Sequence, residues 1–307
     1  MKLSLSTNWC NRRFSRGEEI AEKALELGFD ELELGFRTTI GQVPGFKAML
    51  KRIPVGSIHA YCPVPVSAPS GHPELFQLAS FAAGERALAR AHVVRNIRFA
   101  AEIGADTVVL HAGRVAFSSL FTLLDSGGLR AVFELGGKKT DYKPYARILK
   151  RAWRIRRARG AKMLKRFRDE IEALVPVLRE CGVTLALENL PYLEGFPDEE
   201  ETAALVADFA DAPVRGWFDT GHHRVRVMHG WIPADSPLPP ERFAGMHLND
   251  VVDYSDDHLP PGEGKVDFAA LKPLAESVRH VVFEPNGEVG EEALRRGLAH
   301  IRSLWGG

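Results

Sequence analysis

The sequence predicts a single (β/α)8 TIM barrel domain over residues 1–307, with an enlarged fourth βα loop. Eight strand-like runs alternate with helical segments along the 307 residues, and no linker divides them. The runs are nearly continuous in apolar residues, which is typical of parallel strands that are buried on both faces. A doubly wound open sheet is the alternative. It is disfavoured because no glycine-rich phosphate loop follows the first strand.

The individual elements follow from hydrophobic periodicity and from helix-end signals. Gly28 and Gly182 are expected to end helices, and Asp198 is expected to cap one at its N-terminus. The expected strands cover residues 3–7, 31–36, 55–60, 106–110, 183–187, 214–218, 243–248 and 281–283. The expected helices cover a short stretch after Pro44 and residues 18–27, 84–103, 161–181, 198–209 and 291–305.

Residues 114–160 are too long for an ordinary connection, so we expect an insertion with structure of its own after the fourth strand. Within it, one apolar helical face is indicated by Tyr145, Ile148, Leu149, Ala152 and Trp153.

The segment 143–168 carries twelve Lys or Arg and no acid, although the whole chain balances 40 basic against 40 acidic residues. Two interpretations of this basic segment stay open. It is either a solvated helix that pairs with acidic parts of the barrel or with a second copy of the chain, or a rim that receives phosphate from a phosphosugar or a nucleic acid.

Composition narrows the class of protein. The chain is 45% apolar, which is enough for a large core, and no run approaches the length of a membrane span. Cys10, Cys62 and Cys181 are too few and too irregularly spaced for a disulfide framework or a thiolate zinc site. Because the N-terminus also lacks a signal-peptide pattern, the expected compartment is the cytoplasm, with no membrane partner.

Ligand-type residues follow the strands. The run from Val214 to Phe218 ends in Asp219, and His222 comes three residues later. Taken alone, Asp-Thr-Gly is also good turn chemistry. However, six strand ends carry His, Asp or Glu and none carries Lys or Arg, and all strand ends of a barrel meet at one mouth. Buried carboxylates need a compensating charge, so the pattern predicts a divalent metal site. The candidates are His59, His111, Glu188, Asp219, His222, His247, Asp256, His258 and Glu284.

The motifs at these strand ends resemble those of the xylose-isomerase-like TIM barrels, which include sugar isomerases and epimerases and the endonuclease IV group of DNA repair enzymes. The resemblance spans the chain in order, with 114–160 unmatched. The motifs that carry it are Ile-His-Ala at 58–60, Leu-His-Ala-Gly at 110–113, Leu-Glu-Asn-Leu at 187–190, Phe-Asp-Thr-Gly-His at 218–222, Met-His-Leu-Asn-Asp at 246–250, His-Leu-Pro-Pro-Gly-Glu-Gly at 258–264 and Phe-Glu-Pro at 283–285.

The epimerase branch implies one Mn²⁺-, Co²⁺- or Mg²⁺-like ion, with Glu188, Asp219, His247 and Glu284 as its ligands. Such an ion would hold a carbonyl and a neighbouring hydroxyl of the sugar and stabilise the enediolate that forms on proton loss. Glu188 and Glu284 would remove and return the proton as the catalytic pair.

The same resemblance implies substrate-binding roles around the ion. His222 would bind or polarise a substrate oxygen, and Glu194 matches the spacing of a further substrate-binding Glu. His59, His111 and His258 are further candidates for contacts with the sugar. The Arg that ketose epimerases place about six residues after the metal-binding His is replaced here by Asp253, which argues against a simple ketohexose as the substrate.

The endonuclease branch uses the same four ligands plus His59, His111, His222, Asp256 and His258 to hold three zinc ions. All nine ligand types are present in this chain, so phosphodiester hydrolysis at abasic DNA is the alternative function. A metal-bound barrel that only binds a ligand is a third hypothesis, which the paired Glu residues disfavour. We therefore predict a divalent-metal-dependent isomerase or epimerase that acts on a small carbohydrate, either a sugar, a sugar phosphate or a polyol, as a monomer or a homo-oligomer.

Overall fold

The computed structural model describes residues 1–116, 126–235, 238–255 and 258–306. In this part of the chain, eight parallel strands close a barrel in the order β1-β10-β9-β8-β6-β4-β3-β2. This confirms the predicted (β/α)8 architecture. The strands are β1 (Ser4–Ser6), β2 (Glu31–Leu34), β3 (Val55–His59), β4 (Thr107–Leu110), β6 (Thr184–Glu188), β8 (Val214–Asp219), β9 (Phe243–Leu248) and β10 (His280–Phe283).

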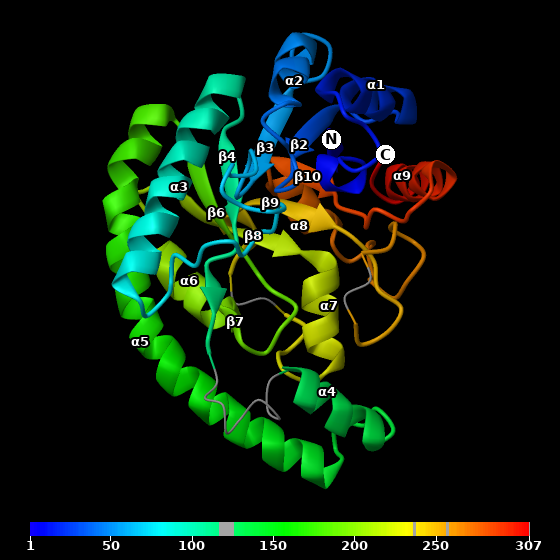
Figure 1. The fold of residues 1–307 in the computed structure, drawn as a ribbon. Helices are drawn as coiled ribbons and strands as arrows, with labels where there is room; N and C mark the ends of the chain where they lie inside the picture. The colour runs from blue at the N-terminus through cyan, green and yellow to red at the C-terminus, as the bar shows by residue number, and fades with distance from the viewer. Residues whose placement is uncertain (117–125, 236–237, 256–257, 307) are drawn as a thin grey trace.

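Helices surround the barrel, and the two termini lie near each other beside α9 (Figure 1). None of the helices in the described ranges combines the length and the apolar character needed to cross a membrane. The helices are α1 (Gly17–Leu27), α2 (Val43–Met49), α3 (Ala83–Ile103), α4 (Ser126–Leu135), α5 (Lys143–Cys181), α6 (Glu199–Asp208), α7 (Thr220–Met228), α8 (Lys272–Ser277) and α9 (Glu291–Trp305), with short 3-10 turns at Thr7–Trp9 and Pro240–Arg242.

Local sequence signals explain where several helices begin and end. Gly28 and Gly182 follow α1 and α5 with φ of 95° and 63°, the left-handed conformation that a glycine adopts without steric cost. Asp198 caps α6, because its side chain accepts a hydrogen bond from the backbone N–H of Glu201 at 2.9 Å. These three predictions are confirmed. A small antiparallel pair, β5 (Gly113–Arg114) with β7 (Gly195–Phe196), joins the loops that follow β4 and β6.

The insertion differs from its predicted form at its C-terminal end. We expected a new helix from about Ala161, but α5 is continuous from Lys143 to Cys181, 39 residues or about 58 Å of helix. Figure 1 shows α5 running along the outside of the barrel and continuing beyond it, where α4 packs against its first half. The prediction was wrong at Gly160. Glycine often ends a helix, but Gly160 lies inside α5, which tertiary contacts stabilise.

The first half of α5 packs through the apolar face that the sequence indicates. Tyr145 and Ala152 are buried in a cluster with Phe133 of α4, Leu193 and Trp231, and Trp153 packs against its edge. The Tyr145 hydroxyl donates to the carbonyl of His229 and accepts from the indole N–H of Trp231. The insertion is therefore attached to the loop after β6 and to the segment that follows α7.

Part of the basic segment pairs with acids of the barrel, as one of the two interpretations expects. Arg156 is fully buried, and its guanidinium lies 2.6 Å from Glu201 and 3.1 Å from Asp198, at the start of α6. It also donates to the carbonyl of Gly195 at 2.6 Å. A side chain at Gly160 would place its Cβ 2.5 Å from Glu201 Oε1, so this glycine gives the network room.

The Arg156 network predicts a large effect on stability. Arg156→Met leaves the Glu201 and Asp198 carboxylates without their buried partner, so the free energy of unfolding should fall by about 3 kcal/mol. Urea unfolding followed by circular dichroism measures this change. The matched control is Arg154→Met, since Arg154 is exposed on the same helix and should change stability by less than about 0.5 kcal/mol. Equal stability of the two variants would contradict the prediction.

Candidate metal centre

The strands bring the candidate ligands to one mouth because alternate residues of a strand share a face. One residue from each of four strands packs in a small cluster inside the barrel, namely Val109, Ala186, Trp217 and Val282. Two positions further on, the same chain segments present His111, Glu188, Asp219 and Glu284. The candidates therefore lie above an apolar floor. This surrounding lowers the local dielectric and strengthens every charge interaction among them.

Four buried side chains form the central group, Glu188, Asp219, His247 and Glu284, and one donor atom from each lies within 4.8 Å of the others. Nδ1 of His247 is 3.1 Å from Glu188 Oε1, 3.2 Å from Glu284 Oε2 and 3.7 Å from Asp219 Oδ2. Three carboxylates and one imidazole are a donor set that suits Mn²⁺, Co²⁺, Mg²⁺ or Zn²⁺. The four predicted ligands thus converge with a geometry that could hold one divalent ion.

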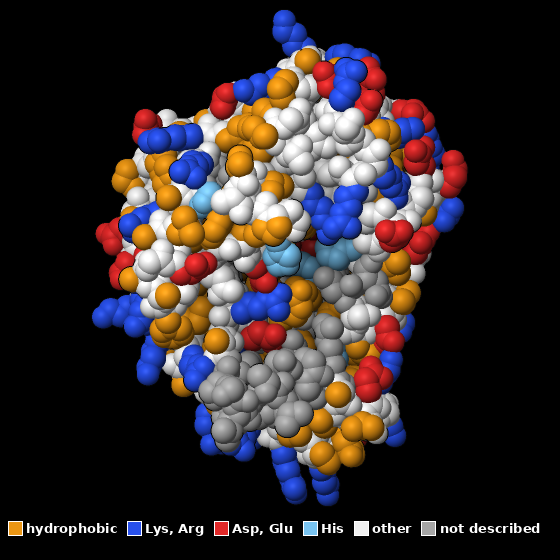
Figure 2. Space-filling model, viewed as in Figure 1, with side chains coloured by type: hydrophobic (Ala, Val, Ile, Leu, Met, Phe, Trp, Pro, Cys, Tyr) orange, Lys and Arg blue, Asp and Glu red, His pale blue; other side chains and the backbone are white. Residues whose placement is uncertain are grey.

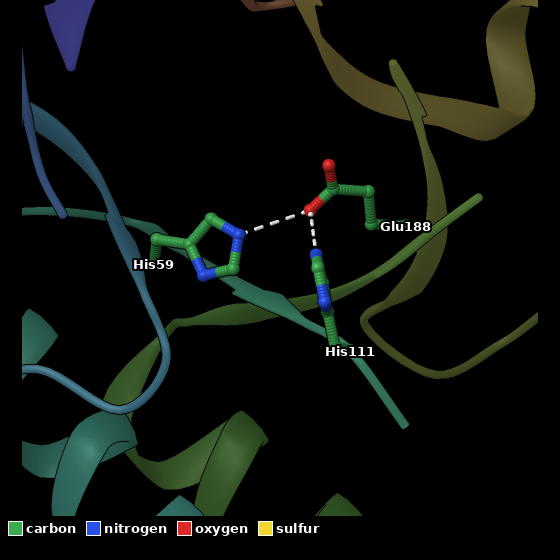
Figure 3. A group of neighbouring side chains, drawn as sticks. All are labelled: His59, His111 and Glu188. Carbon is green, nitrogen blue, oxygen red and sulfur yellow. Dashed lines mark hydrogen bonds and ion pairs between the residues drawn. The ribbon is translucent and has the colours of Figure 1, made fainter. Parts of the chain in front are cut away.

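A second group shares Glu188 with the first. Nε2 of His59 and Nε2 of His111 each lie 3.0 Å from Glu188 Oε2, while the other oxygen of Glu188 faces His247. Figure 3 shows the two imidazole rings approaching this one carboxylate oxygen from β3 and from the end of β4. These three donors also meet the spacing of a metal site. Glu188 could therefore bridge two ions.

Burial and mutual charge set the protonation of the group. Burial raises the pKa of Glu188, but the imidazoles of His247 and His111 lower it by more, to well below its usual value. Burial lowers the pKa of His247, but the carboxylates of Glu284, Glu33 and Glu188 raise it well above its usual value. Burial raises the pKa of Asp219 to about 6. Without a metal the group therefore holds a proton on His247 at neutral pH, and a cation at Nδ1 must displace that proton.

The pKa values of the two histidines in the second group shift in opposite directions. Burial lowers the pKa of His59, but the hydrogen bond to Glu188 and the charges of Glu188, Glu284 and Glu33 together raise it by more, so the net shift is upward. Burial also lowers the pKa of His111, and Glu188 opposes this only in part, so the net shift is downward. A neutral imidazole is the form that binds a metal. The downward shift favours that form in His111, and the upward shift disfavours it in His59.

Glu33 on β2 was not among the predicted site residues. Its carboxylate is fully buried, lies 3.1 Å from Nε2 of His247 and accepts a hydrogen bond from Ser57 at 2.9 Å. This contact turns Nδ1 of His247 toward the other carboxylates and fixes the proton on Nε2. Glu31 and Glu33 alternate with apolar residues along this strand, and that alternation predicts a strand without indicating which of its faces enters the barrel.

Two amides position the remaining carboxylates and were also missed. Asn249 donates to Asp219 Oδ2 at 2.7 Å, and Asn8 donates to Glu284 Oε1 at 3.0 Å. The backbone N–H of His222 donates to Asp219 Oδ1 at 2.7 Å. Asp219 thus has both oxygens held by the protein and Glu284 has one, which orients the two carboxylates toward His247.

The other predicted site residues lie around the central group. His222 places Nδ1 2.8 Å from the carbonyl of Asn189 and 3.5 Å from Glu188 Oε1, and its ring is 5.4 Å from that of His258. His258 contacts the carbonyl of Glu284 through Nδ1. Glu194 lies beside Arg114, with 3.9 Å between Oε1 and Nη1. Asp256 lies outside the described residues.

Asp253, the position at which ketose epimerases carry an Arg, faces the insertion. Its two carboxylate oxygens lie 2.8 and 2.6 Å from Nζ of Lys138, which follows α4. Lys138 also lies over the ring of Tyr254, 4.8 Å from its centre. The loop after β9 is thus joined to the insertion at this position.

The contact between Glu33 and His247 predicts a change in metal affinity. Glu33→Gln removes the carboxylate that orients the imidazole, so the affinity for Mn²⁺ or Zn²⁺ should fall by about 10-fold to 100-fold. Isothermal titration calorimetry on chelator-treated protein measures it. Glu31→Gln is the matched control, because Glu31 lies on the same strand but pairs with Lys2. An unchanged affinity in Glu33→Gln would show that the contact does not support metal binding.

Comparisons with known proteins agree with this architecture. A profile described as Xylose isomerase-like TIM barrel matches residues 21–304. No curated protein sequence matches the chain. A similar solved structure is 3-keto-D-glucoside 4-epimerase from E. coli, with 18% sequence identity over 99% of both chains and a TM-score of 0.66. D-psicose 3-epimerase from Clostridium cellulolyticum is 15% identical over 99% of both chains, with a TM-score of 0.64. A Thermus thermophilus protein soaked with zinc chloride is 22% identical over 100% of this chain and 98% of its own, with a TM-score of 0.57. Since the profile covers most of its length, the chain belongs to the xylose isomerase-like TIM barrel family.

Proposed function

We propose that the protein is a divalent-metal-dependent isomerase or epimerase that acts on a sugar or a sugar-like polyol. The observation that carries this proposal is the buried group of Glu188, Asp219, His247 and Glu284, whose donor atoms lie within 4.8 Å of one another. Glu284 also lines a cavity of about 580 Å³ at the mouth. A substrate of sugar size in this cavity would lie against the ligand group.

A divalent ion held by these four residues would supply positive charge to substrate oxygens as negative charge develops on them. Proton transfer falls to the two glutamates. Glu284 lines the cavity, and Asn8 holds its Oε1, so it is placed to take a proton from substrate or return one. Glu188 lies deeper, with an exposed fraction of 1%, and is the second member of the pair.

His222 is the proposed substrate-binding imidazole. Its ring lies beside Glu188, and its Nδ1 is fixed on the carbonyl of Asn189, which sets the orientation of the ring. Glu194, His59, His111 and His258 remain proposed contacts to substrate hydroxyls. Similar structures include a D-tagatose 3-epimerase-like protein, a D-psicose 3-epimerase and a 3-keto-D-glucoside 4-epimerase, and this supports sugar chemistry as the class.

One observation favours a second candidate function, a trinuclear zinc phosphodiesterase that acts at abasic DNA. Glu188 could bridge the central group and the group of His59 and His111, as expected when two ions lie side by side. In that reading His222 and His258 are further ligands, and nucleic acid is the partner.

The glutamate pair predicts the effect of one substitution on turnover. Glu284→Gln removes a proton-transferring carboxylate and should reduce kcat for any active sugar by at least about 100-fold. A panel of ketoses and keto-sugars is followed for epimer formation and for metal-dependent uptake of solvent deuterium. Circular dichroism checks the fold of the variant. Full activity of Glu284→Gln would contradict the assignment of Glu284.

The phosphodiesterase alternative is tested by metal content together with cleavage. If the sugar function is right, elemental analysis should find about one equivalent of bound metal, and an abasic duplex should stay intact. The matched variant is His59→Ala, because His59 belongs only to the second group. Three zinc equivalents, lost in part in His59→Ala, with cleavage of the duplex would establish the alternative and exclude the isomerase.

A further inference from the structure

The cavity beside Glu284 has a positively charged wall. Its lining includes Arg12 and Arg37, which follow β1 and β2, together with Glu284 and His258. Figure 2 shows Lys and Arg side chains directly beside the hollow in which His side chains are visible. The positive charge therefore borders the same space as the proposed reaction centre.

Arg12 and Arg37 have no carboxylate within salt-bridge distance among the residues that the structure describes. Their neighbour Arg13 is different, since it donates to the carbonyls of Gly287 and Val289 and lies over the ring of Trp9. Arg13 thus has a structural role, because it ties the loop after β1 to the loop after β10. Its anchoring leaves Arg12 as the guanidinium of this loop that is available to a ligand.

Asn8 fixes Arg37 relative to the reaction centre. The Asn8 side chain accepts a hydrogen bond from the backbone N–H of Arg37 at 3.2 Å and donates to Glu284 Oε1 at 3.0 Å. One amide therefore connects the backbone of the arginine with a proposed metal ligand. Because Asn8 holds the backbone of Arg37 beside Glu284, a ligand group bound by Arg37 would lie near the atoms that react.

Two guanidiniums on one cavity wall repel each other, and a bound anion relieves this repulsion. Arg37 is half-buried; burial first and then the charge of Arg12 lower the pKa of Arg37, while Glu284 opposes the shift. The exposed carboxylate of Glu288 also lines this cavity, but it does not form a salt bridge with either arginine in the described ranges. Guanidinium groups bind phosphate and carboxylate oxygens in pairs of parallel hydrogen bonds.

We infer that Arg12 and Arg37 form an anion-binding subsite of the substrate pocket, which takes the phosphate group of a phosphorylated sugar or polyol. This inference rests on the proposed function and deepens it by naming the substrate class. Phosphate fits better than a sugar carboxylate, because its three terminal oxygens can satisfy two forked donors at once. By holding the phosphate group away from the reacting carbonyl, the subsite orients the substrate.

Binding of inorganic phosphate tests the subsite without any turnover. The purified protein is titrated with phosphate by calorimetry, as wild type, as the double variant Arg12→Gln/Arg37→Gln and as the control Arg98→Gln. Arg98 is exposed on α3 and also lacks a salt bridge in the described part of the chain. The dissociation constant should rise by about 10-fold to 100-fold in the double variant and stay unchanged in the control. Circular dichroism establishes that all three proteins are folded.

Paired substrates provide the second readout. For a ketose and its phosphate ester, the ratio of the two kcat/KM values should favour the ester in wild type and fall by about 10-fold or more in the double variant. Phosphate binding that is absent, or equal in wild type and double variant, would overturn the inference, since phosphate held by a metal ion alone does not depend on the arginines. Stronger arginine-dependent binding of gluconate than of phosphate would overturn the assignment to phosphate.

These outcomes separate the inference from the proposed function. Arginine-dependent phosphate binding without turnover of any sugar supports the subsite and counts against the isomerase. Turnover of unphosphorylated sugars, with no preference for the ester and no arginine-dependent phosphate binding, supports the isomerase and overturns the subsite.

Discussion

The burial of several carboxylates around one histidine is the constraint on which the site depends. Glu188, Asp219 and Glu33 have exposed fractions of 1%, 0% and 0%, and Glu284 of 6%. Uncompensated charges at such depth would cost several kcal/mol each. His247 lies between Glu33 on one side and the other three on the opposite side, so a single imidazolium partly compensates all four. A divalent cation at Nδ1 would replace that proton with a larger charge.

The packed interior of the barrel holds these carboxylates in place. The apolar cluster of Val109, Ala186, Trp217 and Val282 fills the interior below the carboxylates, and Trp217 contacts the ring of His247 at 5.0 Å between centres. Because these side chains are packed, the ligands above them have little freedom to move apart in response to their repulsion. The outer core between strands and helices supplies the stability that a strained polar centre requires.

The sequence was sufficient to predict the fold and the convergence of the candidate ligands at the strand ends, because both depend on local patterns. Nearly continuous apolar runs identify buried parallel strands, and a barrel brings their ends together. Glu33 could not be assigned in this way, since its role depends on the register that places it opposite His247. Asn8 and Asn249 are ordinary loop residues in sequence. The continuity of α5 was missed because Arg156 is buried by contacts with α6, 42 to 45 positions away, which overrides the helix-ending signal of Gly160.

The two sides of the mouth differ in how their charges are neutralised, and this bears on the substrate. On the side of β9, Asp253 is already paired with Lys138 of the insertion. A sugar hydroxyl that contacted Asp253 would compete with that ion pair. On the side of β1 and β2, Arg12 and Arg37 form no ion pair with a carboxylate in the described residues. An anionic ligand would therefore pair with them without displacing a protein carboxylate. The asymmetry is what a pocket requires if it recognises an anionic end of the substrate on one side and leaves the other side to the insertion.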